Sequence, residues 1–130
     1  MLVAQSGASV VTVDIEPRGV MVAMDLHRLG FPDECFNLIL CSHVLEHVRD
    51  DMQCMRELFR VFKVGGIAIL PVPVHEYQAT VEFGFAREDL GGHVREYGHD
   101  YFNRLAKAGF SPIPEAQHIA AVTKQCADGS

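Results

Sequence analysis

The chain has 130 residues, a length that suits a single domain over residues 1–130 and leaves little room for two. Hydrophobic residues make up 48% and charged residues 22%, so a disordered tail or a low-complexity linker is excluded as the main content. The formal net charge of −6 excludes a broad basic field, and neither a nucleic-acid nor a membrane partner is indicated. No apolar run reaches the roughly 20 residues that span a bilayer, and the first residues lack the pattern of a signal peptide.

The cysteines indicate a reducing compartment. The chain has four, at positions 35, 41, 54 and 126, and no two of them form a C-x-x-C pair. Three lie in apolar segments, where cysteine acts as a small buried hydrophobic residue. The spacing matches neither a disulfide framework nor a zinc ribbon. We therefore expect free thiols and a cytoplasmic protein.

Apolar runs predict the strands. In chain order they cover residues 9–13, 20–24, 36–41 and 66–70. Continuous apolar runs of this length are typical of strands buried on both faces, as in a parallel sheet.

One strong helical pattern lies between the third and fourth runs. Asp50 with Gln53 three residues later predicts a capped N-terminus, and apolar residues follow at helical spacing to Phe62. The pair Gly65 and Gly66 is expected to provide the left-handed exit.

A second helix is expected over residues 101–108, with Asp100 as its cap and Gly109 at its end. The stretch 74–98 has mixed polarity and is expected to form a long excursion that could act as a lid. The alternation of strands and helices predicts an open α/β sheet.

Two acids stand where ligands bind in such sheets, beyond the carboxyl ends of strands. Asp14 follows the first run and Asp25 follows the second. A carboxylate there can accept hydrogen bonds from ribose hydroxyls or from an adenine amine, or it can simply cap a turn. A strand followed by aspartate is common, so the pair supports a cofactor role better than either acid alone. We expect both carboxylates to face one cleft.

Residues 42–47 read Ser-His-Val-Leu-Glu-His and contain H-x-x-E-H, the inverted zinc-peptidase pattern. On a helix, His43 and His47 would hold zinc and Glu46 would activate water, so a zinc hydrolase is one alternative. However, the pattern directly follows a buried strand and ends after one turn. We therefore expect no metal there, and the two histidines then line a loop near the ligand cleft. Residues 93–100 are also rich in donors and either face a substrate or form a solvated loop.

Taken together, these pieces resemble the class I S-adenosylmethionine-dependent methyltransferases and, more narrowly, the type 11 methyltransferase domain. The resemblance covers roughly residues 2–112. It lies in the run ending at Asp14, the Phe31-Pro32-Asp33 turn, residues 36–48, residues 55–66 with their glycine turn, and Ala108-Gly109-Phe110.

The resemblance implies a three-layer open, mostly parallel sheet of the Rossmann-like type and S-adenosyl-L-methionine as the cofactor. It implies that Asp14 holds the ribose hydroxyls and that Ile15 packs on the adenine. It further implies that Asp25 contacts the adenine amine and that Leu26 lies beside the ring. The implied activity is methyl transfer to an unidentified small-molecule or macromolecular acceptor.

The resemblance also places residues near the reacting methyl group. Cys41 and Ser42 match the strand end near the methionine part of the cofactor. His43 and His47 border the acceptor side and are the candidate catalytic residues, either of them as a general base.

The family's G-x-G-x-G loop is nowhere in this chain. Residues 1–7 resemble the end of the helix that follows that loop, so we expect the first strand of the sheet to be missing. Its loss would expose two strand edges, which a homodimer would cover. Residues 111–115 are expected to begin a sixth strand, with no clear seventh. The alternative function is a non-catalytic methyltransferase-fold remnant or interaction module.

Overall fold

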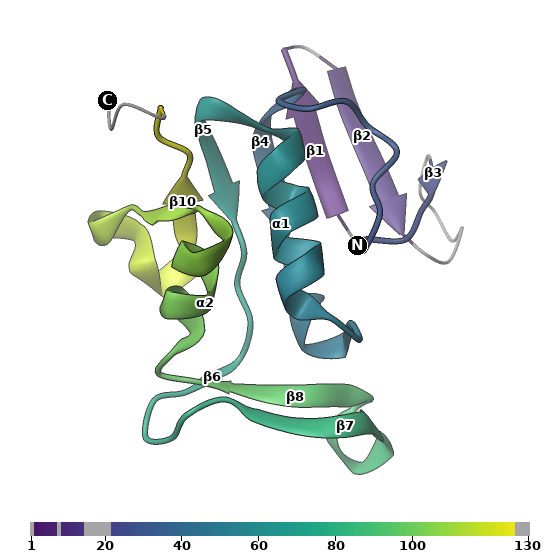
Figure 1. Cartoon of the computed structure of the whole chain (residues 1–130), viewed down its shortest axis with the longest axis vertical. Helices are drawn as coiled ribbons and strands as arrows, with labels where there is room; N and C mark the ends of the chain where they lie inside the picture. Colours follow the sequence, from purple (N-terminus) through teal and green to yellow (C-terminus); the bar gives the residue numbers. More distant parts are fainter. Residues whose placement is uncertain (1, 8, 15–21, 127–130) are drawn as a thin grey trace.

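The computed structural model describes residues 2–7, 9–14 and 22–126 (Figure 1). Its main element is a seven-stranded sheet with the strand order β3-β2-β1-β4-β5-β10-β9. The strands are β1 Leu2–Ser6, β2 Ser9–Asp14, β3 Val22–Ala23, β4 Phe36–Cys41, β5 Phe62–Ile69, β9 Ser111–Pro112 and β10 Ala121–Thr123. In the described chain β2, β3, β4, β5 and β9 share one direction, whereas β1 and β10 run against them. The expected open and mostly parallel α/β sheet is confirmed.

Strand β1 fills the central position that the sequence pattern predicts to be empty. Leu2 pairs with Val13 of β2 on one side and with Cys41 of β4 on the other, antiparallel to both. The expectation of a helix end at residues 1–7 is therefore wrong for residues 2–7. The physical reason is the tight turn after Ser6, where Gly7 has a φ of +57°, because so short a connection joins two strands only as an antiparallel hairpin. The inner edges of β2 and β4 are paired, so a homodimer is not needed to cover them.

The helices α1 Asp51–Val61 and α2 Tyr101–Ala108 lie on the same face of the sheet (Figure 1). The predicted cap of α1 is confirmed, because Asp50 Oδ1 accepts a hydrogen bond from the Gln53 amide at 3.1 Å. The glycine exit predicted for α1 is wrong: Phe62 is already extended and begins β5. Among the described residues, no helix is long and apolar enough to cross a membrane.

The second helix ends as predicted but is not capped as predicted. Gly109 terminates α2 with a φ of +116°. Asp100 makes no side-chain cap. Its Oδ1 instead accepts hydrogen bonds from the amide and hydroxyl of Thr80, at 2.8 and 2.6 Å. The carboxylate that sequence spacing assigns to the helix therefore holds the segment preceding β7.

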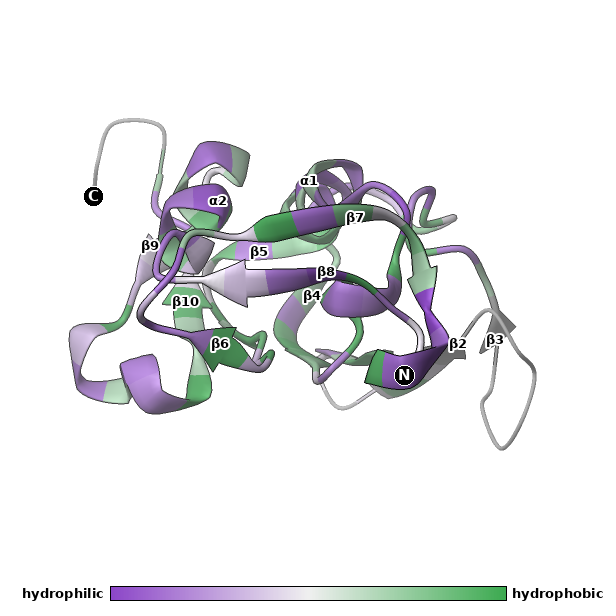
Figure 2. Ribbon diagram, turned by 90° about the horizontal axis from the view of Figure 1, so that it is seen from below, coloured by the Kyte–Doolittle hydropathy of each residue, from purple (hydrophilic) through white to green (hydrophobic). Residues whose placement is uncertain are grey.

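Residues 74–98 form a second, smaller sheet of order β6-β8-β7. It comprises β6 Val74–His75, β7 Val81–Arg87 and β8 His93–Gly98. Figure 1 shows this sheet across one end of the molecule, and Figure 2 shows β8 between the other two strands. Three short 3-10 turns complete the described elements, η1 Leu45–His47, η2 Glu88–Leu90 and η3 Pro114–Ile119.

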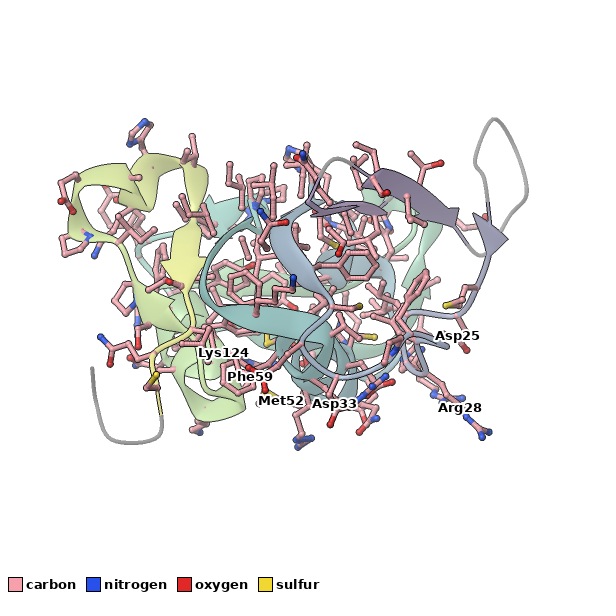
Figure 3. The ribbon with its side chains drawn as sticks, turned by 90° about the horizontal axis from the view of Figure 1, so that it is seen from above. Asp25, Arg28, Asp33, Met52, Phe59 and Lys124 are labelled. Carbon is pink, nitrogen blue, oxygen red and sulfur yellow. The ribbon has the colours of Figure 1, made fainter. Side chains whose placement is uncertain are left out.

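Strand β10 corrects the expectation that no seventh strand follows. It pairs with β5 antiparallel, so that Val122 lies beside Ala68. Just beyond the strand, Lys124 Nζ donates to the carbonyls of Phe59 and Phe62 at 3.0 and 3.1 Å and lies 4.3 Å from the centre of the Phe59 ring (Figure 3). A cation at the carboxyl end of α1 also complements the helix dipole.

The two faces of the main sheet differ in cover. Phe36 and Ile39 of β4 are buried under the helices, whereas Leu38, Leu40 and Ile67 are 38, 40 and 46% exposed on the opposite face. In Figure 3 the side chains on that face project away from the layer of Met52 and Phe59. Because both described α-helices lie on one face, the third layer implied by the resemblance has no α-helix in this part of the chain.

We expect Gly109→Ala to destabilise the chain more than Gly91→Ala does. Both glycines have positive φ, but a Cβ at Gly109 would come within 2.6 Å of a Phe59 ring carbon, whereas one at Gly91 meets nothing within 4 Å. Strain plus overpacking predicts a loss of about 2–4 kcal/mol for Gly109→Ala, against about 1 kcal/mol for Gly91→Ala. Urea unfolding measures both, and equal losses would contradict the packing argument.

Candidate functional site

The predicted cofactor residues follow strands that end at one edge of the sheet. β2 and β3 are parallel neighbours in which Asp14 pairs with Ala23, two residues before Asp25. The expectation that both acids end adjacent strands is confirmed. The side chain of Asp14 and all of Ile15 lie outside the described residues, so their contacts stay predictions.

Asp25 is held by a short hydrogen-bonded chain. Its Oδ1 accepts from the His27 amide at 3.0 Å and lies 2.7 Å from His27 Nδ1. His27 Nε2 in turn accepts from the Asp50 amide at 3.0 Å. Because Nε2 is an acceptor, Nδ1 is the nitrogen that donates to the carboxylate. The hydrogen bonds from the backbone and then the side chain of His27 lower the pKa of Asp25. This carboxylate is thus oriented and ionised, yet its side chain stays 54% exposed.

The other residues predicted near the cofactor are less accessible. Leu26 is buried in the hydrophobic core together with Leu29. Cys41 is fully buried, and burial raises the pKa of its thiol to about 12. Ser42, the next residue, is half-buried. Of the set Leu26, Cys41 and Ser42, only the serine retains substantial exposure.

Residues 42–47 after β4, here called the histidine loop, form a tight turn rather than a long helix. His43 has a φ of +55° and its amide donates to the Pro71 carbonyl at 2.9 Å. The turn η1 that follows has three residues, so His43 and His47 do not share the face of a regular helix. The expected early end of this segment is confirmed. His43 is exposed, whereas Glu46 is 2% exposed and has its Oε2 3.7 Å from His43 Nδ1.

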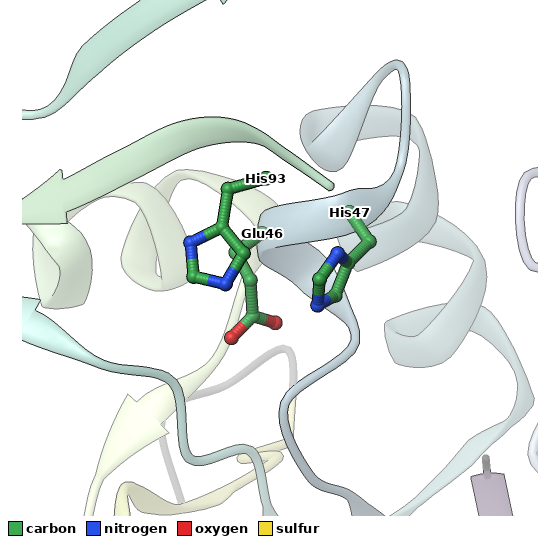
Figure 4. A group of neighbouring side chains, drawn as sticks. All are labelled: Glu46, His47 and His93. Atoms are coloured by element: carbon green, nitrogen blue, oxygen red, sulfur yellow. The ribbon is translucent and has the colours of Figure 1, made fainter. Parts of the chain in front are cut away.

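His93 joins this loop from the smaller sheet. Its ring meets the His47 ring edge-on, with centroids 4.7 Å apart and an interplanar angle of 85°. One ligand atom each from Glu46, His47 and His93 lies within 4.8 Å of the others, and Figure 4 shows the carboxylate beside both rings. Sequence reasoning singled out residues 93–100 as rich in donors but assigned His93 no role. Only the fold reveals its neighbours, because they lie more than forty residues earlier in the chain.

Arg95 fixes the smaller sheet against the histidine loop. This side chain is 2% exposed. Its Nη1 donates to the carbonyls of Leu45 and Val48, both at 2.6 Å, and its Nη2 donates to the Arg49 carbonyl at 2.9 Å. Its Nε donates to Glu82 of β7 at 3.0 Å. The segment expected to act as a lid is therefore anchored to η1 by one guanidinium.

A second set of contacts joins both helices to the smaller sheet. Asp51 Oδ2 accepts from the Tyr97 hydroxyl at 2.7 Å and from Arg104 Nη1 at 2.8 Å. Arg104 also donates to Glu82 at 3.1 Å. Burial, followed by the charge of Asp51, raises the pKa of Tyr97. The hydroxyl therefore stays a donor to this carboxylate at neutral pH.

A shallow groove of about 700 Å³ runs between α1 and α2. It is lined by Met52, Arg56, Asp100, Asn103, Arg104 and Lys107. None of the predicted cofactor or catalytic residues lines it, so the candidate site is the edge beyond β2, β3 and β4 rather than this hollow.

We expect the buried thiols to resist modification in the folded chain. Burial raises the pKa of both Cys41 and Cys54 to about 12, whereas Cys126 is exposed. At pH 8 only about one buried thiol in ten thousand is then ionised, and the thiolate is the reactive form. Peptide mass spectrometry after a timed pulse of an aromatic disulfide reagent should find Cys126 modified first. Labelling of Cys41 at the rate of Cys126 would show that the carboxyl end of β4 opens readily.

Residues 1–70 match the sequence model of a family described as methyltransferase domain. The ubiquinone/menaquinone biosynthesis C-methyltransferase UbiE of Xylella fastidiosa (strain M23) is 43% identical over 56 residues, which cover 39% of this chain and 22% of that protein. An uncharacterized methyltransferase of Mycobacterium leprae (strain Br4923) is 30% identical over 136 residues, which cover 89% of this chain and 50% of that protein. The chain thus spans half or less of the length of these curated relatives.

A solved structure with the same fold is the Burkholderia thailandensis 1,6-didemethyltoxoflavin-N1-methyltransferase, with bound 1,6-didemethyltoxoflavin and S-adenosylhomocysteine. Its TM-score to this chain is 0.56 at 16% identity, and the match covers 88% of this chain and 60% of that one. At this identity the likeness shows a shared fold and nothing more.

Proposed function

The chain belongs to the methyltransferase-domain family whose model matches residues 1–70, and from this premise we propose that it serves methyl transfer from S-adenosyl-L-methionine to an acceptor. The observation that carries the proposal is the meeting of Asp14, Asp25 and the loop after Cys41 at one edge of the sheet. The acceptor is unidentified, and the activity of the whole protein is part of the proposal.

The described residues fit the adenosine half of this cofactor. Asp25 offers an oriented carboxylate that is ionised and more than half exposed. Such a group accepts a hydrogen bond from the amine of an adenine, and a charged acceptor makes that bond stronger than a neutral one. Asp14, at the end of the neighbouring strand, is proposed to hold the ribose hydroxyls.

The fit is poorer for the methionine half. A glycine-rich loop would offer free backbone amides at the centre of the sheet, and glycine allows that approach because it has no Cβ. Here the central position belongs to β1, whose residues pair with both β2 and β4. Leu2 stands there between Val13 and Cys41, with its side chain in the core. The centre of the sheet therefore offers few free backbone amides to the methionine part of the cofactor.

The remaining tasks fall to the histidine loop. The cofactor supplies a methyl group that its sulfonium has already activated, so the protein has to align the acceptor and exclude water. His43 is exposed just beyond β4 and lies near the Glu46 carboxylate. We assign His43, or the exposed His47 at the end of η1, the role of taking the proton from the acceptor.

We predict weak binding of S-adenosylhomocysteine that favours its adenosine half. Losing several hydrogen bonds of about 0.5–1.5 kcal/mol each lowers affinity by about two to three orders of magnitude. Saturation-transfer NMR of the ligand should show strong transfer to the adenine and ribose protons and little to the homocysteine methylenes. Asp25→Asn should weaken binding about 10-fold, because the charged acceptor is lost. Asp89→Asn, which removes an exposed acid paired with Arg87 in the smaller sheet, is the matched control.

Two outcomes would contradict this proposal in different ways. Equal transfer to the homocysteine methylenes would mean that the chain builds a methionine site without a glycine loop. No transfer to any ligand proton would indicate a methyltransferase-fold module that does not use the cofactor.

A further inference from the structure

We propose that Glu46, His47 and His93 form a binding site for a divalent transition-metal ion of the Zn²⁺ or Co²⁺ type. The three residues come from two separate parts of the fold, the turn η1 and the start of β8 (Figure 4). Each offers one ligand atom, and these atoms lie within 4.8 Å of one another.

The buried carboxylate of Glu46 is the strongest indication that a cation binds here. Glu46 is 2% exposed, and its Oε1 is buried without a hydrogen-bond partner among the described residues. A buried carboxylate oxygen without a partner costs free energy, and buried charges are normally paired or coordinate a metal. Figure 4 shows this carboxylate lying beside the two imidazole rings, so a cation placed among the three would provide the partner.

The geometry requires only a small adjustment. Four-coordinate zinc with ligands at 2.0–2.1 Å separates its ligand atoms by about 3.4 Å, so the group has to contract by at most about 1.4 Å from its present outer limit of 4.8 Å. The exposed side chain of His47 can rotate to provide this movement. The backbones need not move, because Arg95 already holds η1 against β8.

The donor types indicate the class of metal. Two imidazoles and one carboxylate suit Zn²⁺ and its neighbours in the first transition row, whereas Mg²⁺ and Ca²⁺ prefer oxygen donors alone. Three protein ligands leave a fourth position open, as in catalytic rather than structural sites. The site differs from the one suggested by H-x-x-E-H, because His93 replaces His43 and Glu46 becomes a ligand.

The site lies just beyond the carboxyl end of β4, where the acceptor is expected. An ion there would bind an oxygen of the acceptor in its open position and make that oxygen easier to deprotonate. This role rests on the proposed function, whereas metal binding itself does not.

Titration of the untagged chain with Co²⁺ tests the proposal, since the visible absorption of the ion reports its coordination number. We expect one Co²⁺ per chain with a four-coordinate spectrum, displaced by Zn²⁺. His93→Ala and Glu46→Gln should each weaken binding by about 100-fold or more, since loss of even a supporting residue typically costs 10–100-fold. His43→Ala should bind like the original chain. His75→Ala is the matched control, because His75 Nε2 also lies 3.7 Å from a glutamate, Glu96, but the described residues offer this pair no third ligand.

Each other result overturns the proposal. Binding that depends on His43 but not on His93 would assign the ion to the sequence pattern instead. Absence of stoichiometric binding would mean that the three residues do not form a metal site. His93 is only half-buried, so His93→Ala is expected to fold, and circular dichroism checks each variant. The titration contains no S-adenosylhomocysteine, so its failure is independent of the cofactor test.

Discussion

A buried guanidinium determines where the two sheets of this molecule meet. Arg95 directs its donors at the carbonyls of Leu45, which begins η1, and of Val48 and Arg49, which follow it. Backbone carbonyls buried at such a place need donors, and arginine brings five in a fixed fork. The charge is expensive to bury and is balanced by Glu82 from the neighbouring strand. The histidine loop, the buried Glu46 and the position of His93 all depend on this contact.

A second arginine organises the loop between β3 and β4 in a similar way. Arg60 donates to the carbonyls of Leu29 and Phe31 and is held in turn by Glu57 and Asp33. Glu57 also accepts from the Leu29 amide at 2.8 Å. The loop that carries the Asp25 and His27 pair is thereby fixed to α1, the same helix that Asp51 joins to the smaller sheet. Helix α1 thus supports both the loop that carries Asp25 and the histidine loop.

The elements that sequence predicts well are those determined by neighbours in the chain. The apolar run 36–41, the cap at Asp50 and the end of α2 at Gly109 all follow from local spacing, and the structure confirms each. The placement of Asp14 and Asp25 at one edge follows from the parallel order of their strands.

The errors arise where a distant partner prevails over a local preference. Asp100 has the spacing of a cap, but Thr80, twenty residues earlier, takes its carboxylate. Residues 2–6 suit several conformations, and only pairing with β2 and β4 makes them a strand. The contact between His47 and His93 could not be foreseen at all, because it depends on Arg95 and on the path of the smaller sheet.

The central place of β1 has a consequence for the order in which the sheet assembles. β1 and β2 form a hairpin whose pairing is local, and such hairpins form within about 1–10 μs. Pairing of β1 with β4 has to close a loop that runs from Gln5 to Leu38 and is correspondingly slower. Until β4 arrives, one side of the hairpin presents unpaired amides and carbonyls to any other extended chain. The yield on refolding therefore depends on two competing steps. The rate at which the intramolecular loop closes is independent of protein concentration, whereas the rate of strand addition by a second molecule rises with concentration.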